Sequence, residues 1–154
     1  AHPLVGGGSG VNTFTAMQDL SVTALRDALN VMADTVDDAG KLLHVRPKIL
    51  LVPYELSWLA MEMMHSVDRP DTADRAKNVM KDELRVIAWP YLTDADAWFL
   101  LTESKDHNVR SYNREKPNVL HDWDFESSSF KVKIRGRWIR GWSDYKGVFG
   151  SSGA

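Results

Sequence analysis

The fold is decided by the stretch RPKILLVPYELSWLAMEMMH, which spans residues 46–65. Its first part, residues 49–52, is a continuous apolar run between two prolines, which is typical of a strand buried on both faces. Its second part, from Tyr54 to about His65, predicts a helix. The inward-facing residues of this helix would be Leu56, Leu59, Ala60, Met63 and Met64.

A second, amphipathic helix is predicted upstream of this stretch. Ser21 is a good N-cap, because its hydroxyl can accept a hydrogen bond from a free amide of the first turn. One apolar face is formed by Val22, Leu25, Leu29, Met32 and Val36. Gly40 would end the helix.

Residues 1–20 contain the Gly-rich run 6–10 and are predicted to form a flexible connector. The alternative is a phosphate-binding loop, but the run lacks the Gly-Lys-Ser/Thr ending that such loops use. Residues 66–82 are polar and predict a loop with a helical turn near 73–80.

Two more strands are predicted at residues 84–89 and 98–102, and their spacing suggests a hairpin-like pair. The polar residues 103–128 surround Pro117 and predict a long irregular loop, which usually carries function or contacts a partner.

From Phe130, apolar and basic residues alternate, which predicts a strand with one solvated face. Gly136 would mark a bulge or the end of pairing. The tail 150–154 is expected to be loose. The whole order indicates one α+β domain over residues 21–154, with helices packed on a mainly antiparallel mixed sheet.

The composition excludes several classes of function. Of the 154 residues, 19 are Lys or Arg and 21 are Asp or Glu, so the formal charge of −2 gives no overall attraction to nucleic acid or an anionic membrane. The absence of cysteine excludes disulfides, thiolate zinc sites and cysteine nucleophiles. No apolar run is long enough to cross a bilayer.

No catalytic, cofactor-binding or metal-binding residue is predicted, and the chain is not expected to be an enzyme. The five histidines lack metal-ligand spacing, and no Gly-x-Ser-x-Gly motif is present. Asp122, Asp124 and Glu126 alternate and could hold a hard cation in an extended segment. A solvated acidic loop is the preferred interpretation, because the full calcium-loop pattern is absent.

One segment near the C-terminus concentrates positive charge, and Trp138 and Trp142 lie among its basic residues. These basic residues are Lys131, Lys133, Arg135, Arg137 and Arg140. A basic strand with aromatic residues can bind single-stranded nucleic acid. The preferred interpretation is the solvated face of an amphipathic strand, and a third is contact with acidic groups of a neighbouring subunit.

Several segments resemble those of tailed-phage major capsid proteins. Residues 40–53 are similar to a strand of that family that precedes a helix. Residues 84–94 and 97–101 look like the next pair of strands, and residues 130–135 with 144–148 look like the final strand and tail. The Gly-rich segment between His2 and Asn12 resembles a connector of Mu-like head subunits.

The resemblance implies the Hong Kong 97-type capsid fold, with this chain supplying the axial domain and the returning strands of the peripheral domain. It implies a structural subunit of an icosahedral shell that self-assembles into hexamers and pentamers. A small nucleic-acid-binding module that uses the basic strand is the alternative function. The expected subunit contacts are the loops 103–128 and 66–82.

The expected location is the virion, after assembly in the host cytoplasm. The implied partners are copies of the chain, scaffold or other head proteins, and packaged DNA through weak non-specific contact, with no membrane and no cofactor. The N-terminal arm, the extended hairpin loop and the spine helix of the family have no counterpart in the predicted elements. We therefore expect the chain to be the C-terminal part of a longer protein.

Overall fold

The computed structural model contains two compact units, Ala1–Asn108 with Tyr145–Ala154 (unit 1) and Val109–Asp144 (unit 2). Within them, the structure describes residues 2–3, 9–10, 12–14, 16–37, 39–68, 77–107, 109–143 and 145–153. Unit 1 holds both helices and a four-stranded sheet, and unit 2 is a long β-hairpin. The α+β class with a mixed, mainly antiparallel arrangement of strands is confirmed.

The first helix, α1, spans Val22–Ala33 and begins as predicted. The Ser21 hydroxyl accepts a hydrogen bond from the amide of Ala24 at 3.1 Å, which satisfies one free donor of the first turn. Four residues of α1 are buried, at the spacing of one helical face: Ala24, Leu25, Ala28 and Met32.

The predicted end of α1 was wrong. The helix stops at its C-cap Asp34, and Val36 pairs with Leu42 in an isolated β-bridge instead of continuing the apolar face. Gly40 has a φ of 76° and its amide donates to the carbonyl of Asp37 at 2.8 Å, so it closes this small loop. A local pairing partner therefore competes with the last predicted helical turn.

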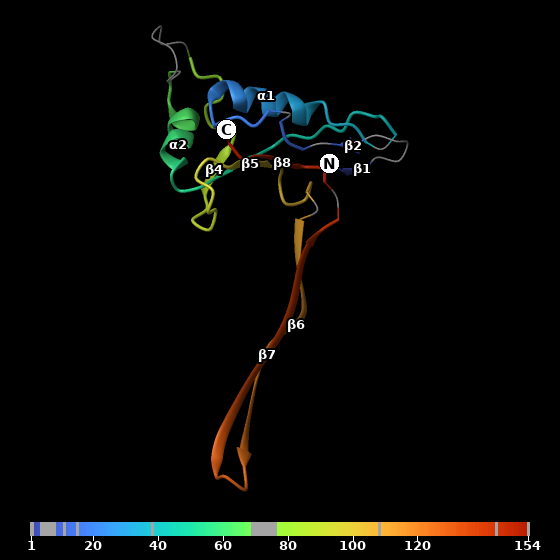
Figure 1. The fold of residues 1–154 in the computed structure, drawn as a ribbon, viewed down its shortest axis with the longest axis vertical. Coiled ribbons are helices and arrows are strands. Elements are labelled where there is room, and N and C mark those ends of the chain that lie inside the picture. Colours follow the sequence, from blue (N-terminus) through green and yellow to red (C-terminus); the bar gives the residue numbers. More distant parts are fainter. Residues whose placement is uncertain are drawn as a thin grey trace. The chain divides into compact units, whose positions relative to one another are not determined.

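The four-stranded sheet of unit 1 has the order β4-β3-β5-β8. Its strands are β3 (Ile49–Val52), β4 (Arg85–Ala88), β5 (Trp98–Leu101) and β8 (Val148–Ser151). Figure 1 labels β4, β5 and β8 of this sheet. β3 runs parallel to β4 and antiparallel to β5, while β5 and β8 are antiparallel. The predicted hairpin-like pairing of β4 with β5 was wrong, because the more apolar β3 lies between them and takes both as neighbours.

One face of this sheet supplies the core of unit 1. Leu50, Val52, Trp98, Leu100 and Phe149 alternate along their strands and are all essentially inaccessible to solvent. They join the buried residues of both helices in one cluster. The residues between them on β3 and β5 are only partly buried, so β3 is fully buried on one face and not on both.

The second helix, α2, spans Ser57–His65 after a turn at residues 54–56. The Ser57 hydroxyl donates to the Tyr54 carbonyl at 2.6 Å, and Ala60, Met63 and Met64 are buried as predicted. Leu56 packs against the core, but Leu59 is 40% exposed, so its inward placement was wrong. The helix starts at Ser57, three residues later than predicted. Its buried face packs on β4 and β3.

The C-terminal tail is built into the sheet, so the expectation that residues 150–154 are loose was wrong for 150–153. Gly150 and Ser151 belong to β8, and the Gly150 amide donates to the carbonyl of Asn12 at 2.9 Å. The Ser151 hydroxyl donates to the carbonyl of Gln18 at 2.8 Å, and the Trp98 indole donates to the same carbonyl at 3.0 Å. The tail thus joins β5 to the segment before α1.

The predicted connector 1–20 includes a short antiparallel pair, β1 (His2–Pro3) with β2 (Ser9–Gly10). Residues 6–8 of the Gly-rich run and the first half of the predicted turn at 73–80 lie outside the described residues. Asp68 and Lys77 form an isolated bridge across the second of these gaps. The division into a connector and a single domain over 21–154 stays a prediction.

Gly147 is expected to be among the least replaceable glycines of unit 1. Its φ is 85°, and an added Cβ would lie 2.6 Å from the Thr102 hydroxyl oxygen, which donates to the Gly147 carbonyl. We expect Gly147→Ala to lower the free energy of unfolding by about 2 kcal/mol or more, from left-handed strain plus the clash. Chemical denaturation followed by circular dichroism measures this change.

Gly40→Ala is the matched control for Gly147→Ala. Gly40 has a similar positive φ, but an added Cβ would meet no atom within 4 Å. It should therefore cost only the conformational strain, about 1 kcal/mol. Equal effects of the two substitutions would show that the close approach to Thr102 has no energetic weight.

Candidate subunit interface

Unit 2 is an antiparallel hairpin of β6 (Val109–Asp124) and β7 (Ser129–Trp142). The strand predicted from Phe130 is confirmed as β7. The irregular loop predicted over residues 103–128 was wrong over 109–124, and so was the expectation that the chain holds no extended hairpin. The loop was predicted because Pro117 lies in the middle of this segment, and proline is unfavourable in the interior of a strand.

The hairpin accommodates Pro117 in an irregularity of its register. Pairing passes from Glu115 and Arg137 to Asn118 and Arg135, which leaves Lys116 and Pro117 opposite Gly136. An added Cβ on Gly136 would approach the Pro117 Cα to 3.5 Å. The prediction that Gly136 marks a bulge is confirmed, and the missing amide of Pro117 costs no ladder hydrogen bond at such a site.

The distal half of the hairpin has one apolar face. Directly opposed residues share a face of an antiparallel pair. The opposed pairs here are Val119 with Ile134, His121 with Val132, and Trp123 with Phe130. The rings of Trp123 and Phe130 lie 5.4 Å apart, and those of His121 and Phe130 lie 6.2 Å apart. We call these six residues the apolar face.

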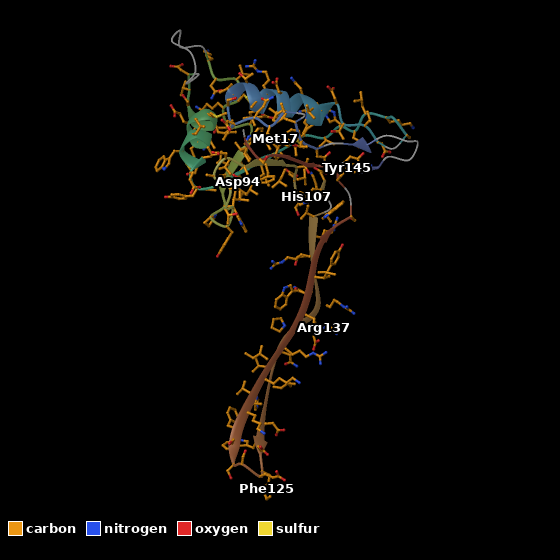
Figure 2. All side chains as sticks on the ribbon, in the orientation of Figure 1. Met17, Asp94, His107, Phe125, Arg137 and Tyr145 are labelled. Atoms are coloured by element: carbon orange, nitrogen blue, oxygen red, sulfur yellow. The ribbon has the colours of Figure 1, made fainter. Side chains whose placement is uncertain are left out.

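The apolar face is open to solvent in the single chain. Every large apolar side chain of β6, β7 and their turn is between 50 and 98% exposed. The most exposed is Phe125, which lies at the turn that joins the strands (Figure 2). An isolated two-stranded hairpin is at best marginally stable in water, so a surface of this kind marks a place where another molecule binds.

The turn at residues 125–128 is held by short polar contacts. The Ser127 hydroxyl donates to the Asp124 carboxylate at 2.8 Å, and Ser128 adopts a positive φ of 51°. The Lys131 ammonium lies 2.5 Å from the same carboxylate. Hydrogen bonds from Lys131 and then Ser127 lower the pKa of Asp124. These contacts fix the turn that presents Phe125.

The five basic residues singled out from the sequence all lie on β7, and the structure divides them by partner. Lys131 pairs with Asp124, and the Arg135 guanidinium lies 3.1 Å from the Glu115 carboxylate. Among the residues that the structure describes, Lys133, Arg137 and Arg140 form no ion pair. The basic face of β7 is exposed to solvent, as expected, but the opposite face of β7, which carries its apolar side chains, is exposed as well.

The acidic residues of the hairpin do not form a cation site. Asp124 is engaged by Lys131 and Ser127, and Asp122 accepts a hydrogen bond from the Trp123 amide at 2.9 Å. Within the described parts of the chain, no group of three His, Asp or Glu side chains is arranged to hold a metal ion. No described helix has both the length and the apolar character needed to span a membrane.

The hairpin was the feature that sequence reasoning missed. Its signal was weak: Val119, His121 and Trp123 recur at every second position just before the serine-rich turn, but Leu120 interrupts the alternation with polar residues. A long strand such as β7 needs a partner strand of similar length. Residues 109–124 are the adjacent segment that supplies this partner.

A family model described as phage capsid protein matches residues 2–150 of the chain, which includes both units. The chain belongs to this family. As a phage capsid protein, it is a structural component of the virion, which accounts for a large apolar surface on a hairpin without a core. Comparisons of this capsid protein with curated proteins and with solved structures gave no match.

The pairing of Lys131 with Asp124 gives a test of the turn of the capsid protein. In Lys131→Gln the pKa of Asp124 should rise toward its ordinary value, because the strongest of its stabilising hydrogen bonds is lost. A depressed pKa stabilises the turn above the unfolded pKa, and this stabilisation disappears as the pH falls through the folded pKa. Carboxyl NMR titration measures the pKa directly.

Lys133→Gln is the control for this titration, because Lys133 is two residues away and makes no ion pair among the described residues. It should leave the pKa of Asp124 almost unchanged. A similar rise in both variants would mean that general positive charge, and not the direct contact with Lys131, lowers this pKa.

Proposed function

We propose that this capsid protein builds an icosahedral shell of the Hong Kong 97 type from hexamers and pentamers of identical chains. The observation that carries the proposal is the hairpin, whose apolar face and turn are solvent-exposed in the single chain. Ring-shaped assemblies require heterologous contacts, in which one surface of a subunit meets a different surface of its neighbour. A long hairpin with an exposed apolar face is suited to be one of these two surfaces.

The distribution of charge supports contacts between unlike surfaces. Residues 109–144 contain eight Lys or Arg and five Asp or Glu, which gives a formal charge of +3. Since the whole chain carries −2, the remaining residues carry −5. A basic hairpin and an acidic remainder attract each other between copies, and they do so without a strong net repulsion.

Within this proposal, the basic residues of β7 contact neighbouring subunits. Lys133, Arg137 and Arg140 are the foremost candidates, because their charges are not neutralised by an ion pair in the described residues. Assembly in the host cytoplasm, contact with scaffold or other head proteins, and weak contact with packaged DNA belong to the same proposal. The segment 103–128, which includes β6 and the turn, and the loop 66–82 would supply further contacts.

Electron microscopy of the product of the full reading frame tests the proposed function. Closed shells with five-fold and six-fold capsomers are expected, together with a salt-dependent assembly rate that reflects the opposite charges of the two units. Monomers that persist at high concentration, low salt and near-neutral pH would overturn the proposal.

A further inference from the structure

Unit 1 contains an open pocket of about 450 Å³ beside the sheet edge formed by β8. Its lining comes from three segments: the chain before α1, the turn that precedes β5, and the end of β8. The apolar part of the lining consists of Met17, Tyr91, Leu92, Ala97 and Phe99. The volume falls in the range of about 300–1,000 Å³ in which proteins enclose small ligands, so an aromatic side chain has room there.

The floor of the pocket is set by Phe99 and Gly150. These two residues are directly opposed on β5 and β8, on the face of the sheet away from the buried Trp98 and Leu100. An added Cβ on Gly150 would lie 2.8 Å from the Phe99 ring, so the ring lies close over the glycine. The glycine therefore lets the aromatic ring settle on the strand and leaves open space above it.

The rim of the pocket is acidic and partly aromatic. Tyr91 is 80% exposed, and its ring lies 5.9 Å from that of Trp89. Asp94 lines the pocket and accepts a hydrogen bond from the Asp96 amide at 3.3 Å. In the part of the chain that the structure describes, neither aspartate forms an ion pair, so a basic partner would find uncompensated negative charge here.

We propose that the pocket of one subunit receives the hairpin turn of a second copy, with Phe125 as the anchor and Lys133 near Asp94 of the rim. This proposal rests on the proposed function and names the surface that the hairpin meets. An exposed aromatic residue at the turn of a hairpin, combined with an apolar pocket that has a polar rim, is the usual composition of an interface hot spot.

Opposite charge favours a second copy of the chain as the partner. Residues 109–144 carry a formal charge of +3, and the remaining residues carry −5. The pocket belongs to the acidic part of the chain and is lined by Asp94, while the turn belongs to the basic hairpin, so copies of the chain attract each other through these two surfaces.

The absence of cysteine from the chain allows a direct test by cross-linking. One sample carries Glu126→Cys, beside Phe125, and a second carries Ser152→Cys, in the lining of the pocket. The two full-length proteins are mixed under assembly conditions and treated with a short bis-maleimide, which tolerates more geometries than a disulfide. Because each chain has one thiol, every covalent dimer reports a contact between two copies.

Ser104→Cys is the matched control, since Ser104 is an exposed serine of unit 1 outside the pocket. We expect the Glu126→Cys and Ser152→Cys mixture to form mixed dimers at least about tenfold faster than the mixture with Ser104→Cys. Adding Phe125→Ala to the Glu126→Cys chain should slow the reaction by about tenfold or more, as loss of an anchor does.

The outcomes separate the pocket proposal from the proposed function. Shells by electron microscopy with equal cross-linking to Ser152→Cys and Ser104→Cys would overturn the pocket and leave assembly standing. Dominant dimers of Glu126→Cys with itself would overturn it in favour of contact between hairpin turns. The absence of both shells and cross-links would contradict the proposed function itself.

Discussion

Trp98→Ala should lower the free energy of unfolding of unit 1 by about 3–5 kcal/mol, which is a large part of the stability of a small domain. Trp98 is the largest fully buried side chain. Its ring lies 5.9 Å from Phe14 and 6.2 Å from Phe149, so its removal leaves a cavity between strands β5 and β8 and the segment before α1.

The substitution also removes a buried hydrogen bond. The Trp98 indole donates to the Gln18 carbonyl, which also accepts the Ser151 hydroxyl. Alanine leaves that carbonyl with one fewer donor in a partly buried place, which adds to the cost of the cavity. Equilibrium denaturation, monitored by far-ultraviolet circular dichroism, gives the change in unfolding free energy.

Trp58→Ala is the control for Trp98→Ala, because Trp58 is 75% exposed at the start of α2. It should change the unfolding free energy by less than about 1 kcal/mol. If both tryptophan substitutions destabilised unit 1 equally, the assignment of Trp98 to the centre of the core would be wrong.

Val132→Ser combined with Ile134→Ser should abolish shell assembly and leave unit 1 folded. The two side chains are 55 and 70% exposed in the single chain, and both belong to the apolar face. Burial of a side chain of this size contributes about 1.5–3 kcal/mol. Because each is already partly covered, we expect a loss of about 2–4 kcal/mol per contact, or roughly 30-fold to 900-fold in affinity.

The measurement is electron microscopy together with sedimentation of the full-length product, and circular dichroism confirms that unit 1 remains folded. Trp58→Ser with Met61→Ser is the control, since it removes two exposed apolar side chains of α2, outside the hairpin and the pocket. It should still give shells, because neither side chain belongs to the apolar face. Shells from the first double variant would remove the apolar face from the interface.

The elements that sequence reasoning predicted correctly are those with strong local signals. The N-cap at Ser21, the apolar run of β3 and the period-two pattern of β7 all depend on neighbouring residues. The bulge at Gly136 is also local, since glycine in a strand weakens pairing. The elements that were wrong depend on pairing partners that hydrophobic periodicity does not specify. The end of α1 competes with the Val36–Leu42 bridge, and the tail is fixed by Asn12 and Gln18.

The candidate interface shows the same division. The basic residues of β7 were found by composition, but their pairing with Asp124 and Glu115 follows from the register of β6. Phe125 is surrounded by polar residues in the sequence, so no local pattern singled it out. The structure places it at the turn between β6 and β7, where its side chain is exposed.

The sequence by itself determined the α+β class, the positions of both helices and of strands β3, β4, β5 and β7, and the resemblance to phage capsid proteins that the family match bears out. Hydrophobic periodicity and capping act over a few residues, so they can be read along the chain. The tertiary structure decided which strands are neighbours, that residues 109–142 form one hairpin, and which apolar residues stay in water. Those features arise from pairing and burial between segments, both neighbouring and distant in the chain, for which no local pattern specifies the partner.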